Sequence, residues 1–207
     1  MRRIGLFGGT FDPPHFGHLV LAEWARARLR LDRVVFVPAG TPPHKRGRQL
    51  THAALRLALT RLAVRGNPAF TVSGFEARRA GPSFTVDTLR HFGARQPGAR
   101  LYLLMGADSL ADFPNWHEPG EIARLATLVV AARPGPAASA RDAGARSRSF
   151  VPARVRGRVV LLDNPPVAIS SSALRARARA GRSLRYLVPD AVAAFVARHG
   201  LYRRSAR

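Results

Sequence analysis

The sequence predicts an α/β fold, a doubly wound parallel sheet that carries a small helical part at its C-terminal end. Short aliphatic runs without polar alternation recur along the chain, as expected for parallel strands that are buried on both faces. Segments with helical periodicity lie between these runs, and such alternation is typical of a parallel sheet with helices on both faces. The predicted strands cover residues 4–7, 34–37, 101–105, 128–131 and 159–162.

The helices are predicted from apolar residues that recur every three or four positions. The first helix opens at Gly17 and His18 and continues to Leu29, with its apolar residues on one face. The last helix has Pro189 in its first turn and Gly200 where it stops. Further helices are predicted over residues 54–62, 86–92 and 118–125, a further strand region over 70–72 and 74–76, and an exposed loop without a site over 133–156.

Length and composition indicate one globular domain. The chain has 207 residues, of which 46% are hydrophobic, and we expect residues 1–207 to form a single domain with 170–202 as its C-terminal helical portion. It lacks an apolar run long enough to span a membrane, and its first residues lead into a strand rather than a signal sequence. The absence of cysteine excludes disulfides, thiolate catalysis and cysteine metal sites. We therefore expect a soluble cytoplasmic protein.

The net charge of +22 allows two interpretations. A basic surface attracts nucleic acid through its phosphates, so a nucleic-acid-binding module is one hypothesis. However, the arginines are dispersed, and neither a recognition helix nor an aromatic-interleaved ribonucleoprotein motif is present. A basic surface around an enzyme with anionic substrates explains the charge better, so no specific nucleic acid or membrane partner is expected.

The segment GGTFDPPHFGH, residues 8–18, follows the first predicted strand directly. Gly8 and Gly9 let the backbone turn sharply and expose successive N–H groups that suit phosphate oxygens. The helix that opens behind them adds a partial positive charge at the same place. His15 and His18 are three residues apart, so both rings can point the same way. These features predict a polyphosphate site.

This segment resembles the H-x-G-H signature of the nucleotidylyltransferase superfamily, and its longer form is similar to that of bacterial nicotinate-mononucleotide adenylyltransferases. The resemblance implies a Rossmann-like nucleotidylyltransferase fold. It also implies transfer of the adenylyl group from ATP to nicotinate mononucleotide in NAD biosynthesis, with deamido-NAD and pyrophosphate as products. Other superfamily members, such as pantetheine-phosphate adenylyltransferases and cytidylyltransferases, remain alternatives.

Five further segments match the same family in order along the chain: 42–45, 82–89, 105–110, 113–117 and 169–175. In the second, Thr85 is expected to cap a helix whose N–H groups meet the nicotinate carboxylate, and Phe84 stands where the family has tyrosine. In the last, the sequence ISSSALR resembles the family's I-S-S-T-x-[IL]-R, and Arg175 can fork onto phosphate oxygens one turn after a serine cap.

The resemblance implies a role for each matching residue. The expected catalytic residues are His15, His18, Lys45 and Arg175. The expected ATP-binding residues are Gly8, Gly9, Thr10, Phe11, His15, His18, Gly106, Asp108, Arg133, Ile169, Ser170, Ser171 and Arg175. The expected residues for nicotinate mononucleotide are Thr10, Phe11, His44, Lys45, Phe84, Thr85, Trp116 and His117. Mg²⁺ is expected to arrive with ATP rather than in a resident metal site, and the oligomeric state stays open.

Overall fold

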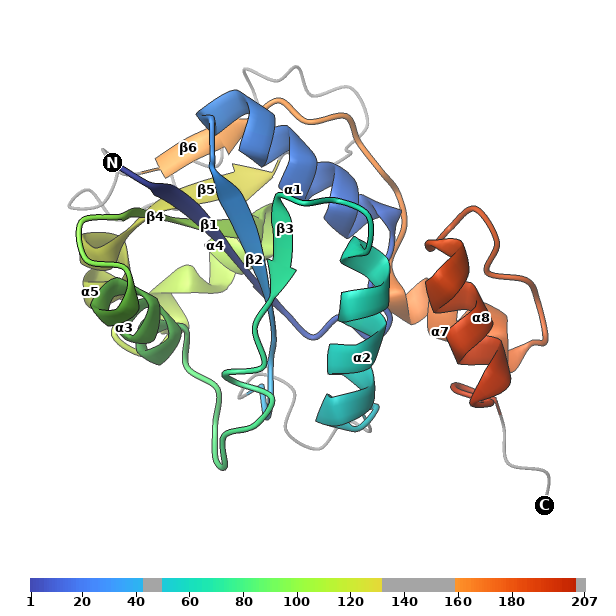
Figure 1. The fold of residues 1–207 in the computed structure, drawn as a ribbon. Coiled ribbons are helices and arrows are strands. Elements are labelled where there is room, and N and C mark those ends of the chain that lie inside the picture. Colours follow the sequence, from blue (N-terminus) through green and yellow to red (C-terminus); the bar gives the residue numbers. More distant parts are fainter. Residues whose placement is uncertain (43–49, 132–158, 204–207) are drawn as a thin grey trace.

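A computed structural model describes residues 1–42, 50–131 and 159–203 of the chain. Within these ranges one parallel sheet has the strand order β3-β2-β1-β4-β5-β6, which confirms the predicted doubly wound α/β class (Figure 1). The strands are β1 (Arg3–Gly9), β2 (Arg33–Pro38), β3 (Phe70–Val72), β4 (Arg100–Gly106), β5 (Ala126–Ala131) and β6 (Val159–Leu162).

Strand β1 lies at the centre of the sheet, between β2 and β4. The chain runs outward from β1 through β2 to β3, and then returns to the other side of β1 to continue through β4, β5 and β6. This reversal of strand order is a topological switch point beyond the carboxyl ends of β1 and β4, and open α/β sheets bind their ligands at such points. Gly9 and Gly106 end these two neighbouring strands.

Helices cover both faces of the sheet because its strands point alternate residues to opposite sides. On one face, Ile4 and Leu6 of β1 pack in a buried cluster with residues of α3 (Thr85–Arg95) and α5 (Pro119–Leu125). On the other face, Phe7 packs with residues of α1 (Phe16–Leu29) and α2 (Ala53–Val64) (Figure 1). The helices are α1 (Phe16–Leu29), α2 (Ala53–Val64), α3 (Thr85–Arg95), α4 (Ala107–Asp112), the 3₁₀ turn η2 (Phe113–Asn115), α5 (Pro119–Leu125), α7 (Ser171–Arg179) and α8 (Asp190–Arg198).

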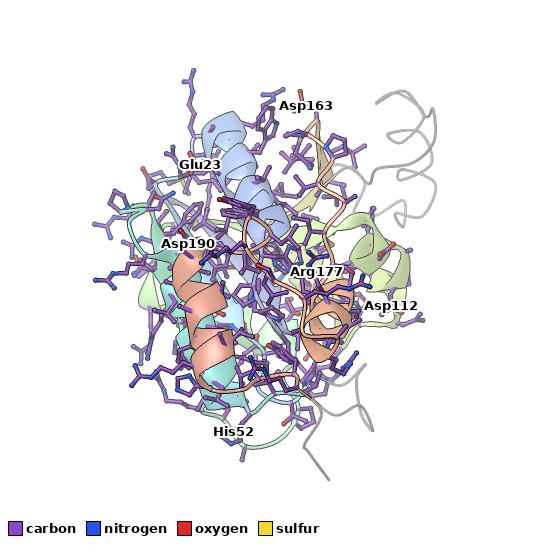
Figure 2. The ribbon with its side chains drawn as sticks, turned by 90° about the vertical axis from the view of Figure 1, so that its right-hand side faces the viewer. Glu23, His52, Asp112, Asp163, Arg177 and Asp190 are labelled. Carbon is purple, nitrogen blue, oxygen red and sulfur yellow. The ribbon has the colours of Figure 1, made fainter. Side chains whose placement is uncertain are left out.

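The C-terminal helices pack on α2 rather than on the sheet. A third buried cluster joins Leu59 of α2 to Leu174 of α7 and to Val192 and Val196 of α8. In the view of Figure 2, α7 and α8 face the reader, with Arg177 on the first and Asp190 at the start of the second. No helix among the described ranges is long and apolar enough to cross a membrane.

The predicted elements are present, with several corrections. Residues 74–76 do not extend the strand region, because Ser73 Oγ accepts a hydrogen bond from Phe75 N–H and the chain turns there. Helix α1 begins at Phe16, one residue before the predicted start, and Pro189 is the residue before α8 rather than a member of its first turn. Helix α4 and η2 were not predicted, and the loop expected over 133–156 lies outside the described residues.

Candidate active site

The loop after β1 turns its main chain toward open space. A Cβ atom added to Gly8 would meet no atom within 4 Å, whereas one added to Gly9 would lie 2.9 Å from the ring of Phe11. Phe11 has a φ of 49° and buries its ring against Phe7 and Phe36. The side chain of Phe11 therefore anchors the loop from below, and only its backbone is available to a ligand.

The two histidines of the predicted motif lie together at the start of α1. Their ring centroids are 3.8 Å apart, and the backbone N–H of His15 donates to Nδ1 of His18 at 3.2 Å. His15 is the residue that precedes the first turn of the helix, so both rings lie at its positive end. The prediction that the two rings converge is confirmed.

His15 is held in its neutral form by burial. Its side chain is only 6% exposed, and its Nδ1 has no hydrogen-bond partner in the described part of the chain. Burial lowers the pKa of His15 to about 4. The second of the two residues between the histidines favours glycine, since a Cβ on Gly17 would lie 3.0 Å from Nδ1 of His15. The glycine of this motif thus has a steric cause.

The segment that follows β6 is bonded to the same loop. Ser171 Oγ donates to the carbonyl of Pro13 at 2.8 Å, and Nη1 of Arg175 donates to the carbonyl of Asp12, also at 2.8 Å. Ser170 caps α7 as predicted, its Oγ accepting from Ala173 N–H at 3.2 Å. Ile169 is half-buried in the cluster that joins α2, α7 and α8. The segment from Ile169 to Arg175 is therefore placed beside residues 10–15, the loop between β1 and α1 that ends at His15 and is called the histidine loop below.

A further tether holds the start of this segment. Asp163 is the first residue after β6, and its Oδ1 accepts a hydrogen bond from Nε1 of Trp24 in α1 at 3.2 Å. Figure 2 shows Asp163 near the end of α1 that lies away from α7. The chain from Asp163 to Ser171 is thus fixed at both ends, by Trp24 in α1 and by Pro13 in the loop before that helix.

Arg56 in α2 was missed by the sequence reasoning, although it joins three loops of the site. Its side chain is 1% exposed and donates to the carbonyl oxygens of Thr51 at 2.8 Å, Thr10 at 2.9 Å and Gly40 at 2.9 Å. Thr10 follows β1 and Gly40 follows β2, so one guanidinium bridges the ends of two neighbouring strands. Burial lowers the pKa of Arg56 from its ordinary value.

Gly40 connects this bridge to the start of α3. Its N–H donates to Ser83 Oγ at 2.9 Å, and a Cβ atom there would clash with the backbone of Glu76. Glu76 is itself buried and accepts a hydrogen bond from the hydroxyl of Thr88. Burial raises the pKa of this carboxyl group. The start of α3 is therefore held by two hydrogen bonds, one at Ser83 and one at Thr88.

Aromatic residues stand beside the start of α3. The rings of Phe84 and His117 are 4.4 Å apart, and Trp116 is half-buried with its ring 5.7 Å from that of Phe113. The prediction that Thr85 caps α3 is wrong. Phe84 takes the extended conformation that precedes the helix, and Thr85 is already helical, which leaves its hydroxyl outside the capping position.

The end of β4 lies at the same switch point of the sheet. Gly106 precedes α4, and a Cβ atom there would meet nothing within 4 Å. Asp108 lies exposed in the first turn of α4. Three predicted site residues, His44, Lys45 and Arg133, lie outside the described residues. Among the residues that are described, no group of three or more histidine and acidic side chains could hold a metal ion.

Apart from Gly106 and Asp108 at the end of β4, the remaining predicted residues fall into two groups. One group holds the loop after β1, the histidine pair and the segment from Ile169 to Arg175. The other holds Phe84, Thr85, Trp116 and His117 beside the start of α3. Arg56 and Gly40 connect the two groups, because Arg56 donates to the carbonyl oxygens of Thr10 and Gly40 and the N–H of Gly40 donates to Ser83 Oγ.

Comparisons with known proteins agree with this architecture. The family model described as cytidylyltransferase-like matches residues 6–177. A probable nicotinate-nucleotide adenylyltransferase of Thermomicrobium roseum is 50% identical over 203 residues, which cover 98% of this chain and 92% of the relative. One of Roseiflexus is 48% identical over 200 residues, covering 97% of this chain and 98% of the relative.

Solved structures show the same fold at lower identity. The nicotinic acid mononucleotide adenylyltransferase of Plasmodium falciparum, complexed with NaAD, aligns with a TM-score of 0.79 at 15% identity and covers 98% of both chains. A putative nicotinate-nucleotide adenylyltransferase from Vibrio parahaemolyticus aligns with a TM-score of 0.69 at 17% identity, covering 99% of this chain and 98% of the other. With relatives this similar over nearly its whole length, the chain belongs to the nicotinate-nucleotide adenylyltransferase family within the cytidylyltransferase-like proteins.

Proposed function

We propose that the chain is a nicotinate-nucleotide adenylyltransferase that converts ATP and nicotinate mononucleotide into deamido-NAD and pyrophosphate. The observation that carries this proposal is the pair of adjacent histidine rings at the start of α1. The pair lies beside the strand-order switch of a chain that is 50% identical to a relative bearing this name. Since ATP is the proposed substrate, we expect the enzyme to act in the cytoplasm as part of NAD biosynthesis.

The reaction joins a phosphate oxygen of the mononucleotide to the α-phosphorus of ATP. As this bond forms, the bond from the α-phosphorus to the bridging oxygen of the β-phosphate breaks, and pyrophosphate leaves with the electron pair. Such a transfer depends on positioning and on neutralising charge more than on a covalent nucleophile. The chain's task is therefore to align two anionic substrates and to hold the phosphates in place.

The triphosphate lies along the loop after β1 in this proposal. Main-chain N–H groups from Gly8 to Phe11 cradle it, and the open space beside Gly8 allows the close approach. Neutral His15 donates its N–H, and His18 donates from Nε2 because its Nδ1 already accepts a hydrogen bond. Arg175 adds donors from α7, with its remaining N–H groups beyond those bonded to Asp12 and Ser172.

The adenosine part lies toward β4 and α7. Gly106 leaves space at the strand end, and the exposed carboxylate of Asp108 accepts hydrogen bonds from ribose hydroxyls. Ile169, Ser170 and Ser171 line the opposite side, and Arg133 is assigned to the same substrate from sequence alone. Mg²⁺ would be bound by the phosphates of ATP and would neutralise part of their charge.

The mononucleotide lies between the two groups of residues. Its pyridine ring stacks on Trp116, beside the paired rings of Phe84 and His117. Its carboxylate accepts from the N–H groups of the first turn of α3 at Thr85, which lack partners within the helix. His44 and Lys45 are assigned to the same substrate from sequence alone. We also propose that residues 1–207 form one domain, because a buried cluster joins α2 to α7 and α8.

The test is a pyrophosphate-release assay with ATP and three acceptors: nicotinate mononucleotide, its amide and phosphopantetheine. We expect turnover with the acid and a lower kcat/KM with the amide, because an amide brings its NH₂ group against N–H donors. Turnover with phosphopantetheine alone would contradict the proposal. Equal kcat/KM for acid and amide would remove the assignment of the carboxylate to α3 while keeping the reaction.

A further inference from the structure

We infer that Tyr202 is a positioning residue for the reaction, which it serves by holding Asp12 and thereby the loop that presents His15. This inference rests on the proposed adenylyl transfer, since it concerns the alignment of that site. Tyr202 lies near the end of the described chain, whereas Asp12 lies 190 residues earlier, and the hydroxyl of Tyr202 donates to Oδ1 of Asp12 at 2.7 Å.

Asp12 is the centre of a set of hydrogen bonds in the histidine loop. Its side chain is 1% exposed, and its second carboxylate oxygen, Oδ2, accepts from the N–H of Thr51 at 3.2 Å. Its carbonyl oxygen accepts from Arg175 at 2.8 Å. Both ends of this residue are therefore fixed, and only the two prolines separate it from His15. A change at Asp12 is transmitted to the histidine through a short, stiff connection.

The turn after α8 brings Tyr202 to this position. Gly200 has a φ of 58°, and the N–H of Leu201 donates to the carbonyl of Val196 at 3.0 Å, so the chain folds back along its own helix. Tyr202 itself has a φ of 68° and is half-buried. The apolar cluster under α8 holds this turn in place, with Val192 and Val196 packed against α2. The packed turn after α8 thus fixes the position of the Tyr202 ring.

The hydroxyl of Tyr202 stays protonated and serves as a donor. Burial, and then the negative charge of Asp12, raise the pKa of Tyr202 well above its ordinary value. The negative charge of Asp12 also favours the charged form of Arg56, whose guanidinium already bridges the loops after β1 and β2. The C-terminal turn, α2 and the histidine loop therefore meet at one carboxylate.

The test is the substitution Tyr202→Phe, which removes the hydroxyl and keeps the ring. We expect kcat to fall about 10- to 100-fold, as follows from the loss of a hydrogen bond to a charged group that aligns the site. KM for nicotinate mononucleotide should stay within about twofold, since that substrate contacts other elements. Amide hydrogen exchange should quicken in a peptide that spans residues 10–18 and stay unchanged in peptides from β4 and β5.

The matched control is Tyr186→Phe, the same chemical change on a tyrosine that is 86% exposed in the same C-terminal portion. This control should keep the kcat, the KM and the exchange of the parent chain. In an Asp12→Ala background, Tyr202→Phe should have no further effect on kcat, because the tyrosine acts through that carboxylate.

The outcomes separate the inference from the proposed function. If Tyr202→Phe retains both the kcat and the exchange protection of the parent chain, the inference is overturned. Faster exchange with an unchanged kcat also overturns it, since the bond would then be structural only. Faster exchange in a chain that never adenylylates nicotinate mononucleotide refutes the proposed function and leaves the tether from Tyr202 to the loop supported.

Discussion

The backbone N–H of His15 donates to Nδ1 of His18, and this bond decides which nitrogen of His18 carries the proton. A nitrogen that accepts a hydrogen bond has no hydrogen of its own, so neutral His18 is protonated at Nε2. The backbone of one histidine thus orients the other as a hydrogen-bond donor. His15 therefore has two roles: its backbone orients His18, and its own neutral ring is a second hydrogen-bond donor.

His18→Ala should lower kcat by about 10²–10³, because it removes a donor to the charge that develops on the transferred phosphate. His15→Ala should lose nearly as much. The measurement is steady-state turnover, with the melting temperature as a check on the fold. Among conservative variants, His18→Gln should retain more activity than His18→Asn, since the glutamine amide reaches the position of Nε2. The reverse order would assign the donated proton to Nδ1.

Gly8→Ala should raise KM for ATP roughly tenfold, because the added methyl group would enter the space that the triphosphate fills in the proposed complex. Its melting temperature should stay unchanged or rise slightly, because a Cβ at Gly8 meets no protein atom within 4 Å. Gly93→Ala in α3 is the matched control, since its Cβ also meets nothing, and both KM values should be those of the parent chain. An unchanged KM in Gly8→Ala would place the phosphates elsewhere.

Trp116→Ala should raise KM for nicotinate mononucleotide several-fold while KM for ATP changes little. Aromatic pairs are worth about 0.5–1.5 kcal/mol beyond the area they bury. Because Trp116 is half-buried and packs on the sheet's core, a modest drop in melting temperature should accompany the change. Trp116→Phe keeps a stacking face and should restore most of the affinity. A large loss of stability with both KM values raised together would assign Trp116 to the core alone.

The buried imidazole of His15 should make the protein less stable as the pH falls from about 6.5 to about 4. Its pKa is about 4 in the folded chain and 6.5 in the unfolded chain, so the unfolded state binds the proton first. The resulting loss amounts to about 3 kcal/mol when both pKa values have been passed. Denaturant unfolding at several pH values measures it, with His15→Gln as the comparison. An equal pH slope in that variant would mean that other groups cause the loss.

Local patterns in the sequence were sufficient for the fold and for the histidine loop. Aliphatic runs and helical periodicity depend on neighbours along the chain, as does the placement of Gly8, His15 and His18 between a strand and a helix. The errors arose where two local solutions compete. Thr85 is a good capping residue, yet the backbone of Phe84 takes the capping position instead. Residues 74–76 have strand-like composition, yet Ser73 and the buried Glu76 favour a turn.

Other parts of the site could not be predicted from one sequence. Arg56 lies in a helix and reads as one of many dispersed arginines, and its partners lie up to 46 residues away. Tyr202 and Asp12 are 190 residues apart. No spacing rule connects such residues, because only the packing of α2 and α8 brings them together. The sequence could at most have drawn attention to a polar residue at a helix position that the apolar periodicity assigns to the core.

Within the described residues, the three hydrogen bonds that the Arg56 guanidinium donates all go to main-chain oxygens. A carbonyl oxygen is the same acceptor whatever side chain its residue bears, so these bonds of Arg56 to Thr10 and Thr51 do not depend on the side chains at those two positions. Side chains in these loops could thus be changed to alter substrate preference while Arg56 keeps the loop backbones in place. Arg56 has no such freedom, because a lysine offers a single ammonium where three fixed directions are required.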